Sequence, residues 1–303
     1  MQDNSVNKDL KTGSIYAILA YLGWGFFPVY WKLLQHVPFL QILCHRVIWS
    51  FVFYTAIMTY KDKSFSIYKP PGFKLIRNLS FGALVLMSNW LVYIYAVNSN
   101  QIVESSLGYF INPLVNILIG VLFLKEKLSR NQTVATALAA IGVLVIALAQ
   151  GHVPWIALFL AVSFSIYGLV KKLNPVSALN SNQYESVMLL PFALVFLMTQ
   201  SYEWVNPENK NLSILLLMGA GVVTGLPLLF FSAAAKRIPY YLMGFFQFLA
   251  PTLQFLSGVV IFNEPLSQSK LVGFIFIWLA GALLILNSWY VSRNTKKGLI
   301  DAI

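Results

Sequence analysis

The sequence predicts an all-α integral membrane protein with ten transmembrane helices, arranged as two inverted five-helix repeats. Three observations lead to this fold class. The 303 residues are 58% hydrophobic and only 10% charged, whereas charged residues make up about a quarter of an ordinary soluble domain. Apolar runs of about 20 residues, the length that crosses a bilayer core, recur along the chain. One stretch of the first half also reappears in the second half.

Ten apolar runs have the length and composition of membrane spans. They cover residues 14–33, 39–60, 75–97, 105–124, 132–150, 154–171, 180–200, 212–234, 241–262 and 269–290. The connections between them are short and carry turn residues, as at 151–154 and 206–211. The sixth run is the shortest. No connection is long enough to form a separate soluble domain.

The first run follows a polar tail, residues 1–13, and could be mistaken for a secretory signal. We expect a retained helix instead, because the apolar run continues past Trp24 and Pro28 without a small-residue cleavage site. A second polar tail covers residues 291–303. Cys44 is the only cysteine, so the sequence allows no internal disulfide.

The net charge of +11 could indicate nucleic-acid binding, but the positions of the charges favour a membrane explanation. If the chain starts in the cytoplasm, nearly all basic residues, Lys171 among them, fall in cytoplasmic segments. The opposite loops keep only Lys32, Lys210 and Lys270, and Arg46 lies inside the membrane. This bias predicts both termini in the cytoplasm, and an even number of spans agrees with it. We therefore expect the lipid bilayer as a partner and no nucleic acid.

Residues 113–130 match residues 251–268 without a gap, and Pro, Gly and Glu residues coincide in one register, as Pro113 does with Pro251. Because each half would hold five spans, the second copy crosses the membrane in the opposite direction. Inverted repeats are typical of secondary transporters, whose substrate sites lie near the midplane between the repeats. The predicted domains are the cytoplasmic tail 1–13, the first repeat 14–150, the second repeat 154–290 and the cytoplasmic tail 291–303.

Prolines inside the spans are candidate hinges. Irregular backbone at membrane depth is tolerated only against protein or a water-filled cavity. Close packing through small residues is the alternative explanation for any single position, but the matched pair Pro113 and Pro251 favours a hinge or a cavity. The predicted hinges are Pro28, Pro113, Pro227 and Pro251.

Polar and aromatic side chains in the same spans predict a substrate cavity. Asn89 and Tyr93 share one helix face, since they are four residues apart. Such groups either bind a solute or only join neighbouring helices by hydrogen bonds, and both explanations stay open. The predicted cavity residues are Trp24, Arg46, Trp49, Ser50, Asn89, Trp90, Tyr93, Tyr109, Asn112 and Gln247.

Arg46 is the most informative of these residues, because a charge at the centre of a membrane helix costs about 2.5–3.5 kcal/mol. Its long side chain could instead reach the outer surface. We favour an interior position, where Arg46 binds an anionic substrate group or pairs with Glu104. Glu185 and His45 are further candidates for charge pairing or proton coupling, although an interfacial position also explains Glu185 and helix packing also explains His45.

Several stretches resemble the RarD-type permeases of the drug/metabolite transporter superfamily, whose halves are called EamA domains. The resemblance covers residues 14–290. It implies a ten-helix inverted-repeat transporter in the cytoplasmic membrane of a bacterium, acting on small organic solutes. Gly225 departs from the family pattern, where a bulkier residue is expected. The stretches are WGFFP (24–28), HRVIWSF (45–51), NWLVYIYAVN (89–98), SLGYFINPLVN (106–116), SFSIYGLVKK (163–172), ESVMLLP (185–191) and GFFQFLAPT (244–252).

The sequence therefore predicts a secondary transporter, or permease, that moves a small organic metabolite or drug-like solute by alternating access. A membrane-embedded enzyme and a non-transporting sensor are the alternatives. The chain has no zinc-protease motif, no nucleophile elbow and no phosphate-binding loop, so we expect no catalysis, no metal and no cofactor. The expected partner is a small-molecule substrate, with a coupling proton or ion as a further candidate.

Overall fold

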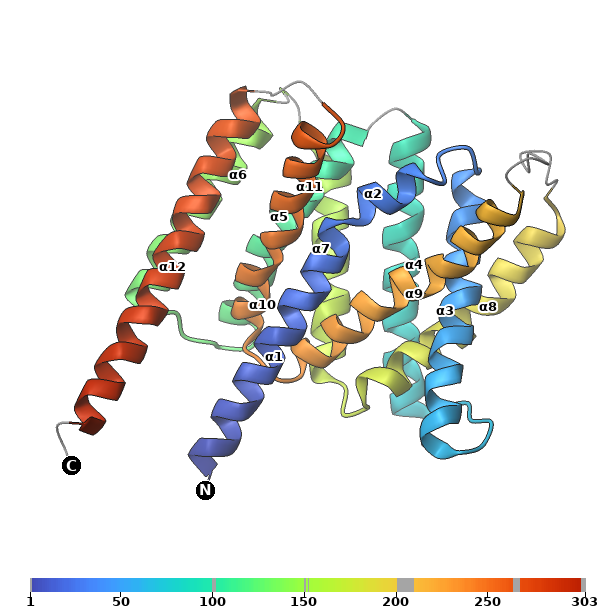
Figure 1. The fold of residues 1–303 in the computed structure, drawn as a ribbon, viewed down its shortest axis with the longest axis horizontal. Helices are drawn as coiled ribbons and strands as arrows, with labels where there is room; N and C mark the ends of the chain where they lie inside the picture. The colour runs from blue at the N-terminus through green and yellow to red at the C-terminus, as the bar shows by residue number, and fades with distance from the viewer. Residues whose placement is uncertain are drawn as a thin grey trace.

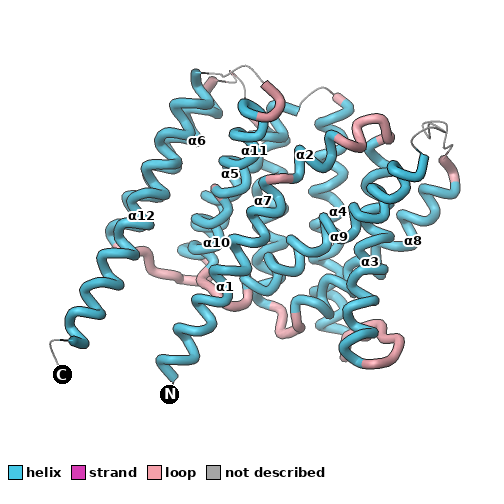
Figure 2. The backbone as a smooth tube through the Cα atoms, viewed as in Figure 1, coloured by secondary structure: helices cyan, strands magenta, loops and turns pink. Residues whose placement is uncertain are grey.

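In the computed structural model, every described element is a helix or a loop (Figure 2). The structure describes residues 2–99, 102–149, 151, 153–200, 210–263 and 268–300. Each predicted apolar run corresponds to one helix or, at the first and ninth runs, to a pair of helices. The helices are α1 (Gln2–Gly25), α2 (Phe27–Lys32), α3 (Phe39–Asp62), α4 (Phe73–Asn98), α5 (Ile102–Leu122), α6 (Arg130–Leu148), α7 (Trp155–Leu173), α8 (Ala178–Met198), α9 (Lys210–Ala235), α10 (Tyr240–Gln247), α11 (Leu249–Val260) and α12 (Gln268–Ile300).

Eight stretches of the described chain are long and apolar enough to cross a membrane. They include the pair α1 and α2, over Lys8–Lys32, and the pair α10 and α11, over Tyr240–Val260. Helix α5 contributes a shorter apolar segment, Leu107–Leu122. Helix α8 is not one of these eight stretches. Its first half carries several buried polar residues, Glu185 among them. The chain is therefore a multi-pass membrane protein.

Local hydrogen bonds determine where some helices begin. At the start of α6, Ser129 Oγ accepts from the Gln132 N–H at 3.3 Å, and Gln132 Oε1 accepts from the Ser129 N–H at 2.8 Å. This reciprocal pair is a capping box. At the start of α8, Ser177 Oγ accepts from the Asn180 N–H at 3.2 Å. Each cap satisfies a backbone N–H that has no partner within its helix.

Two predicted spans are interrupted near proline. The break between α1 and α2 is followed by Pro28, in the first turn of α2. The break between α10 and α11 is followed by Pro251, in the first turn of α11. Pro113 and Pro227 lie inside the continuous helices α5 and α9. Motion at any of these four residues stays a prediction.

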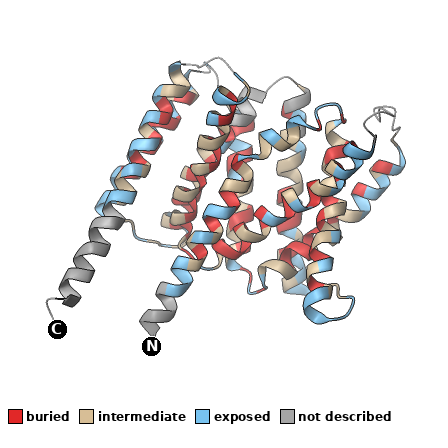
Figure 3. Cartoon of the chain, in the orientation of Figure 1, coloured by how far each residue is buried: buried red, intermediate tan, exposed pale blue. Residues whose placement is uncertain are grey.

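The helices pack side by side, and the start of α1 and the end of α12 lie at the same end of the bundle (Figure 1). Helix α12 packs along α6, α3 packs between α8 and α9, and α5 packs against α7 and α10. Buried residues gather where helices face one another, while exposed positions point outward (Figure 3). Leu144 of α6 and Leu279 of α12 are among the large exposed apolar residues, as expected for a surface in contact with lipid.

Glycines of α9 allow α3 to approach closely. A Cβ added at Gly221 would collide with the main chain of Trp49, and one at Gly225 would lie 3.3 Å from the Tyr54 ring. The Ser50 hydroxyl donates to the Gly221 carbonyl at 3.1 Å, and the Tyr54 hydroxyl donates to the Gly225 carbonyl at 2.9 Å. The unexpected glycine at position 225 therefore serves the contact between α3 and α9.

Candidate functional site

Arg46 of α3 points into the bundle, and its guanidinium lies against two indole rings. The Arg46 Cζ is 5.1 Å from the ring centroid of Trp31 and 5.1 Å from that of Trp90. The Arg46 Nε donates a hydrogen bond to Thr224 Oγ1 at 2.9 Å. These contacts come from α2, α4 and α9, so three elements far apart in the sequence hold one cation in place.

Within the described part of the chain, the Arg46 guanidinium makes one hydrogen bond, from Nε. Among the residues that the structure describes, the Arg46 Nη groups have no hydrogen-bond partner, and no carboxylate lies within ion-pair distance of them. The side chain of Glu104, the predicted partner, lies outside the described residues. Ring faces attract a cation, but they do not supply the paired acceptors that a guanidinium binds best. An anionic group of a solute can supply them.

Aromatic residues continue the wall beside Arg46. The ring centroids of Tyr93 and Tyr109 are 6.3 Å apart, and both phenols are near enough to interact electrostatically with Arg46. Phe39 also packs against Tyr93, with 5.7 Å between centroids. Of the predicted cavity residues, the structure thus brings together Arg46, Trp90, Tyr93 and Tyr109.

Three other predicted cavity residues join helices by hydrogen bonds. Asn89 Nδ2 donates to Ser163 Oγ at 2.8 Å and so links α4 to α7. Asn112 Nδ2 donates to the Ala161 carbonyl at 2.6 Å, and Asn112 Oδ1 accepts from Gln247 Nε2. These bonds link α5 to both α7 and α10. Such contacts were expected if these polar residues only join neighbouring helices. A role of these residues in solute binding stays a prediction.

Trp24 and Trp49 occupy different surroundings. Trp24 packs at the junction of α1, α7 and α9, with ring centroids 5.6 Å from Phe164 and 5.5 Å from Phe231. Trp49 follows Arg46 on α3 and lies against α9 at Gly221. The Trp24 indole thus lies at a helix junction, and the main chain of Trp49 lies in the contact between α3 and α9.

His45 precedes Arg46 on α3 but has a different environment. Both ring nitrogens are buried and lack a hydrogen-bond partner among the described residues. Charging a buried group without partners is costly, so these surroundings do not favour proton carriage by His45. Proton carriage by His45 stays a prediction, and so does a role in helix packing alone.

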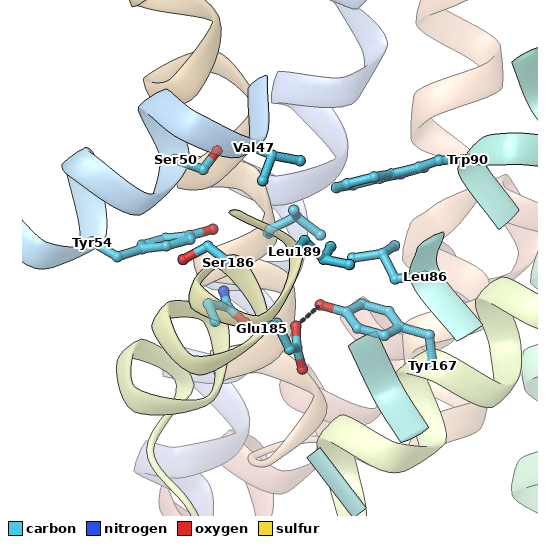
Figure 4. Close-up of a pocket in the computed structure, with 11 residues that line it drawn as sticks. Val47, Ser50, Tyr54, Leu86, Trp90, Tyr167, Glu185, Ser186 and Leu189 are labelled. Carbon is cyan, nitrogen blue, oxygen red and sulfur yellow. Dashed lines mark hydrogen bonds between the residues drawn. The ribbon is translucent and has the colours of Figure 1, made fainter. Parts of the chain in front are cut away.

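A narrow cavity extends from Trp90 to a second charged cluster (Figure 4). Figure 4 shows Val47, Ser50 and Trp90 on one side of the cavity, with Glu185 and Tyr167 opposite. The cavity volume is about 20 Å³, which is room for about one water molecule. An organic solute does not fit in this cavity. The lining residues are Val47, Ser50, Tyr54, Leu86, Trp90, Tyr167, Asn182, Glu185, Ser186, Leu189 and Leu228.

A buried ion pair lies at the far side of this cavity. Lys171 Nζ is 2.6 Å from Glu185 Oε1, and the two side chains are 0% and 5% exposed. The Tyr167 hydroxyl donates to Glu185 Oε2 at 3.0 Å. Lys171 Nζ also donates to Ser181 Oγ at 2.9 Å and to Asn182 Oδ1 at 2.5 Å. These five residues come from α7 and α8.

Lys171 is the main residue whose position the sequence argument missed. The sequence argument counted it among the basic residues on the cytoplasmic side and did not predict that its side chain is fully buried. The reason is that α7 continues to Leu173 and turns Lys171 toward α8. One signal was present in the sequence: Tyr167 and Lys171 are four residues apart and share a helix face.

Charged residues also tie loops together at the end of the bundle where α1 begins. We call Glu126, Lys172 and Lys236 the loop clasp. The Glu126 carboxylate accepts hydrogen bonds from the backbone N–H groups of Tyr240 at 2.7 Å and Tyr241 at 2.8 Å. A carboxylate at the start of a helix, here α10, is favoured by the helix dipole. Lys172 Nζ lies 3.9 Å from Glu126.

Lys236 completes the loop clasp. Its Nζ donates to the Asn174 carbonyl at 2.5 Å and so links the end of α9 to the end of α7. Burial, together with the nearby positive charges of Lys171 and Arg237, lowers the pKa of Lys236 to about 8. Lys236 therefore gives up its proton at a lower pH than an exposed lysine does.

Comparison with known proteins identifies the family. The profile of the EamA-like transporter family matches residues 11–148. Protein RarD of Escherichia coli (strain K12) is 42% identical to this chain over 298 residues, which cover 96% of this chain and 99% of RarD. The chain belongs to the RarD-type permeases of the EamA family. The resemblance predicted from its motifs is confirmed.

Other proteins similar to this RarD-type chain are consistent with the family assignment. The uncharacterized transporter YojE of Bacillus subtilis (strain 168) is 42% identical over 296 residues, covering 95% of this chain and 98% of YojE. The chloramphenicol-sensitive protein RarD of Pseudomonas aeruginosa is 28% identical over 282 residues, covering 89% and 91%. A crystal structure with 16% identity superposes with a TM-score of 0.73 and covers 91% of this chain and 98% of that chain. That protein shares the fold.

Proposed function

We propose that this RarD-type permease is a secondary transporter that moves a small organic solute with an anionic group by alternating access, and that Arg46 binds the anionic group. The observation that carries the proposal is the environment of the guanidinium. It lies between Trp31 and Trp90, and no carboxylate among the described residues pairs with it. Ionisable residues inside membrane bundles mark substrate or ion pathways by default.

The neighbours of Arg46 also favour a solute with apolar parts. Trp31, Trp90, Tyr93 and Tyr109 provide ring surface around one charge. Binding sites for small organic molecules are commonly built this way, with mostly aromatic or apolar walls and a few polar groups that fix orientation. Amphipathic organic acids and amino acids fit this chemistry better than inorganic anions do.

The pattern of helix contacts supports two inverted repeats. A two-fold axis in the membrane plane would pair α3 with α8, α5 with α10, and α6 with α12, and each of these pairs is in contact. The same axis would relate the contact of α1 with α9 to that of α4 with α7, and both are present. We propose the repeat boundaries 14–150 and 154–290 on this basis.

Matched loops give independent support. Lys125 and Asn263 occupy equal positions in the two copies, and both have a left-handed backbone, with φ of 56° and 53°. The hydrogen bond from the Leu124 N–H to the Ile119 carbonyl at 3.2 Å has its counterpart between Phe262 and Ser257 at 3.1 Å. Similar turns at equal positions favour duplication over chance similarity of apolar helices.

The two copies differ in backbone conformation at the matched prolines, and alternating access requires two copies with unequal conformations. Pro113 lies in an unbroken helix, whereas its counterpart Pro251 follows a break between α10 and α11. Repeats with unequal conformations can exchange those conformations, and this exchange opens a central site to one side and then the other. The small cavity between Trp90 and Glu185 fits a closed stage of such a cycle.

The membrane orientation is part of the proposal. The relatives come from bacteria, and a multi-pass chain of this kind belongs in the cytoplasmic membrane. The distribution of Lys and Arg favours cytoplasmic termini. Arg46 would then lie toward the outer side, and the loop clasp would lie at the cytoplasmic end.

A ligand screen tests the binding site. The purified protein in detergent is heated with amino acids, organic acids and antibiotics, and a solute that binds only the folded state raises the melting temperature. We expect an anionic solute to stabilise the wild type but not the Arg46→Gln variant. The control is Lys61→Gln, which changes an exposed lysine and should be stabilised like the wild type. Equal stabilisation of the Arg46→Gln variant would contradict the assigned site.

A further inference from the structure

The cluster around Glu185 has no assigned role in the proposed transport. We propose that Glu185, with Lys171 as its ion-pair partner, is a proton-exchange site that couples movement of the anionic solute to the proton gradient. This inference rests on the proposed function, because coupling requires a transported solute.

Burial of the pair is the first argument. A buried ion pair is weak support for stability, because removing two charges from water costs about as much as their attraction returns. Lys171 and Glu185 are nevertheless almost completely enclosed, at 0% and 5% exposure. Charged groups at such positions in membrane proteins are typical of proton relays and ion pathways.

Access to water is the second argument. Glu185 borders a cavity with room for about one water molecule, so one water molecule can lie against its carboxylate. Trp90 lines the same cavity and also contacts the Arg46 guanidinium. The proposed proton site and the proposed solute site therefore share one wall.

The partners of Lys171 allow the pair to separate. When a proton adds to Glu185 from water, the carboxylate becomes a neutral carboxyl group and the pair changes from net zero to net +1. Ser181 and Asn182 still accept hydrogen bonds from Lys171, and Asn182 Oδ1 also accepts from Ser232 of α9 at 2.9 Å. The ammonium group thus keeps partners in both protonation states.

Opposing influences act on the Glu185 proton. The ammonium groups of Lys171 and Lys236 and the hydroxyl of Tyr167 favour the carboxylate, whereas burial favours the neutral carboxyl group. Tyr54 of α3 is the remaining titratable group that interacts with Glu185. Both the carboxylate and the neutral carboxyl group therefore have favourable interactions at this position.

The charge change gives the coupling a direction. A proton on Glu185 leaves Lys171 uncompensated, which makes the cavity more positive and favours an anionic group beside Arg46. By the reciprocity of binding, a bound anion then favours protonation of Glu185. A proton and an anionic solute bind together in this scheme, so they move in the same direction.

Infrared difference spectroscopy tests the proton site without knowledge of the solute. Spectra of the folded protein are compared between about pH 8 and about pH 6, where exposed Asp and Glu side chains, with pKa values near 4, stay ionised. We expect the carbonyl band of a protonated carboxyl group to appear at the lower pH in the wild type and to be absent in Glu185→Gln. The double variant Lys171→Gln, Glu185→Gln keeps the pair neutral and should also lack the band.

Arg46→Gln separates this inference from the proposed function. The variant should keep the carboxyl band, because Arg46 is not part of the ion pair, even though it loses solute binding. A band that persists in Glu185→Gln, or a wild type with no band in this pH range, would overturn the proton site. The ion pair would then be a static link between α7 and α8.

Discussion

At the scale of single residues, the shape of the Arg46 side chain matters as well as its charge. The flat guanidinium lies against two rings and donates from Nε to Thr224, and in the proposed site its terminal nitrogens form a paired contact with an acid group of the solute. Lysine carries the same charge as a compact ammonium group and cannot make the stacked or two-point contact.

Arg46→Lys should therefore weaken solute binding by about tenfold or more, about 1.4 kcal/mol. The measurement is a titration of wild type and variant with the solute found by the screen, with Lys61→Gln as the control. Equal affinities would show that only the positive charge matters and that the ring contacts do not orient Arg46.

The ion pair of Lys171 and Glu185 gives a second prediction at this scale. Lys171→Gln leaves the Glu185 carboxylate buried without its partner and should lower the free energy of unfolding by roughly 3–5 kcal/mol. The double variant Lys171→Gln, Glu185→Gln should recover most of that loss, because no unpaired charge stays inside. Denaturation in detergent measures both. A double variant as unstable as the single one would contradict the pairing.

The sequence could predict Arg46 but not the partner of Glu185. Arg46 is recognisable because it interrupts an apolar run, and its cost in a membrane requires a reason. Lys171 lies at the end of an apolar run, beside Lys172, where a lysine normally faces water. Only the turn between α7 and α8 brings it to Glu185, and the shared helix face of Tyr167 and Lys171 does not by itself predict that contact.

At the scale of helices, the contact between α3 and α9 positions the site. Gly221 and Gly225 accept hydrogen bonds from Ser50 and Tyr54 through their carbonyl groups. The same contact brings Thr224 to Arg46. A shift between these two helices would therefore move the Arg46 guanidinium.

Gly221→Ala should separate α3 from α9, because the added methyl group collides with the main chain of Trp49. Overpacking of this kind typically costs about 1–3 kcal/mol, and solute binding should weaken with it. Gly281→Ala on α12 is the matched control, since nothing lies within 4 Å of a Cβ there. If both variants unfold at the same temperature as the wild type, the close contact of α3 and α9 is not important for stability.

Helix positions were predictable from the sequence, whereas helix interruptions were only partly so. An apolar run long enough to cross a bilayer must form a helix, because lipid offers no hydrogen bonds to the backbone. Pro28 and Pro251 stand beside breaks, but Pro113 and Pro227 lie in continuous helices. Whether a proline breaks a membrane helix depends on the neighbouring helices that satisfy its freed carbonyl groups, and these are known only from the fold.

At the scale of the whole molecule, the proposed fold relates the two halves by a two-fold axis in the membrane plane. The start of α1 and the end of α12 lie at the same end of the bundle (Figure 1). The proposed repeat was indicated in the sequence by residues 113–130 and 251–268. The contacts of α3 with α8 and of α6 with α12 were not, because they depend on how the two halves pack.

Reporter domains fused to each end of the chain test the orientation. A reporter that is active only in the cytoplasm should be active at both ends of the chain, because the basic residues concentrate on that side. A reporter fused after residue 200, just beyond the end of α8, should report the opposite side. Termini on different sides would contradict both the even number of spans and the inverted repeat.

Transport by purified protein in liposomes tests the central claim most directly. The solute that stabilises the wild type is placed outside vesicles with a pH gradient, acidic outside, and its accumulation is followed. We predict that the wild type accumulates the solute, that Glu185→Gln exchanges it without accumulation, and that Arg46→Gln does neither. Accumulation by Arg46→Gln at the wild-type rate, or no movement of a bound solute in the wild type, would contradict a transporter built around this arginine.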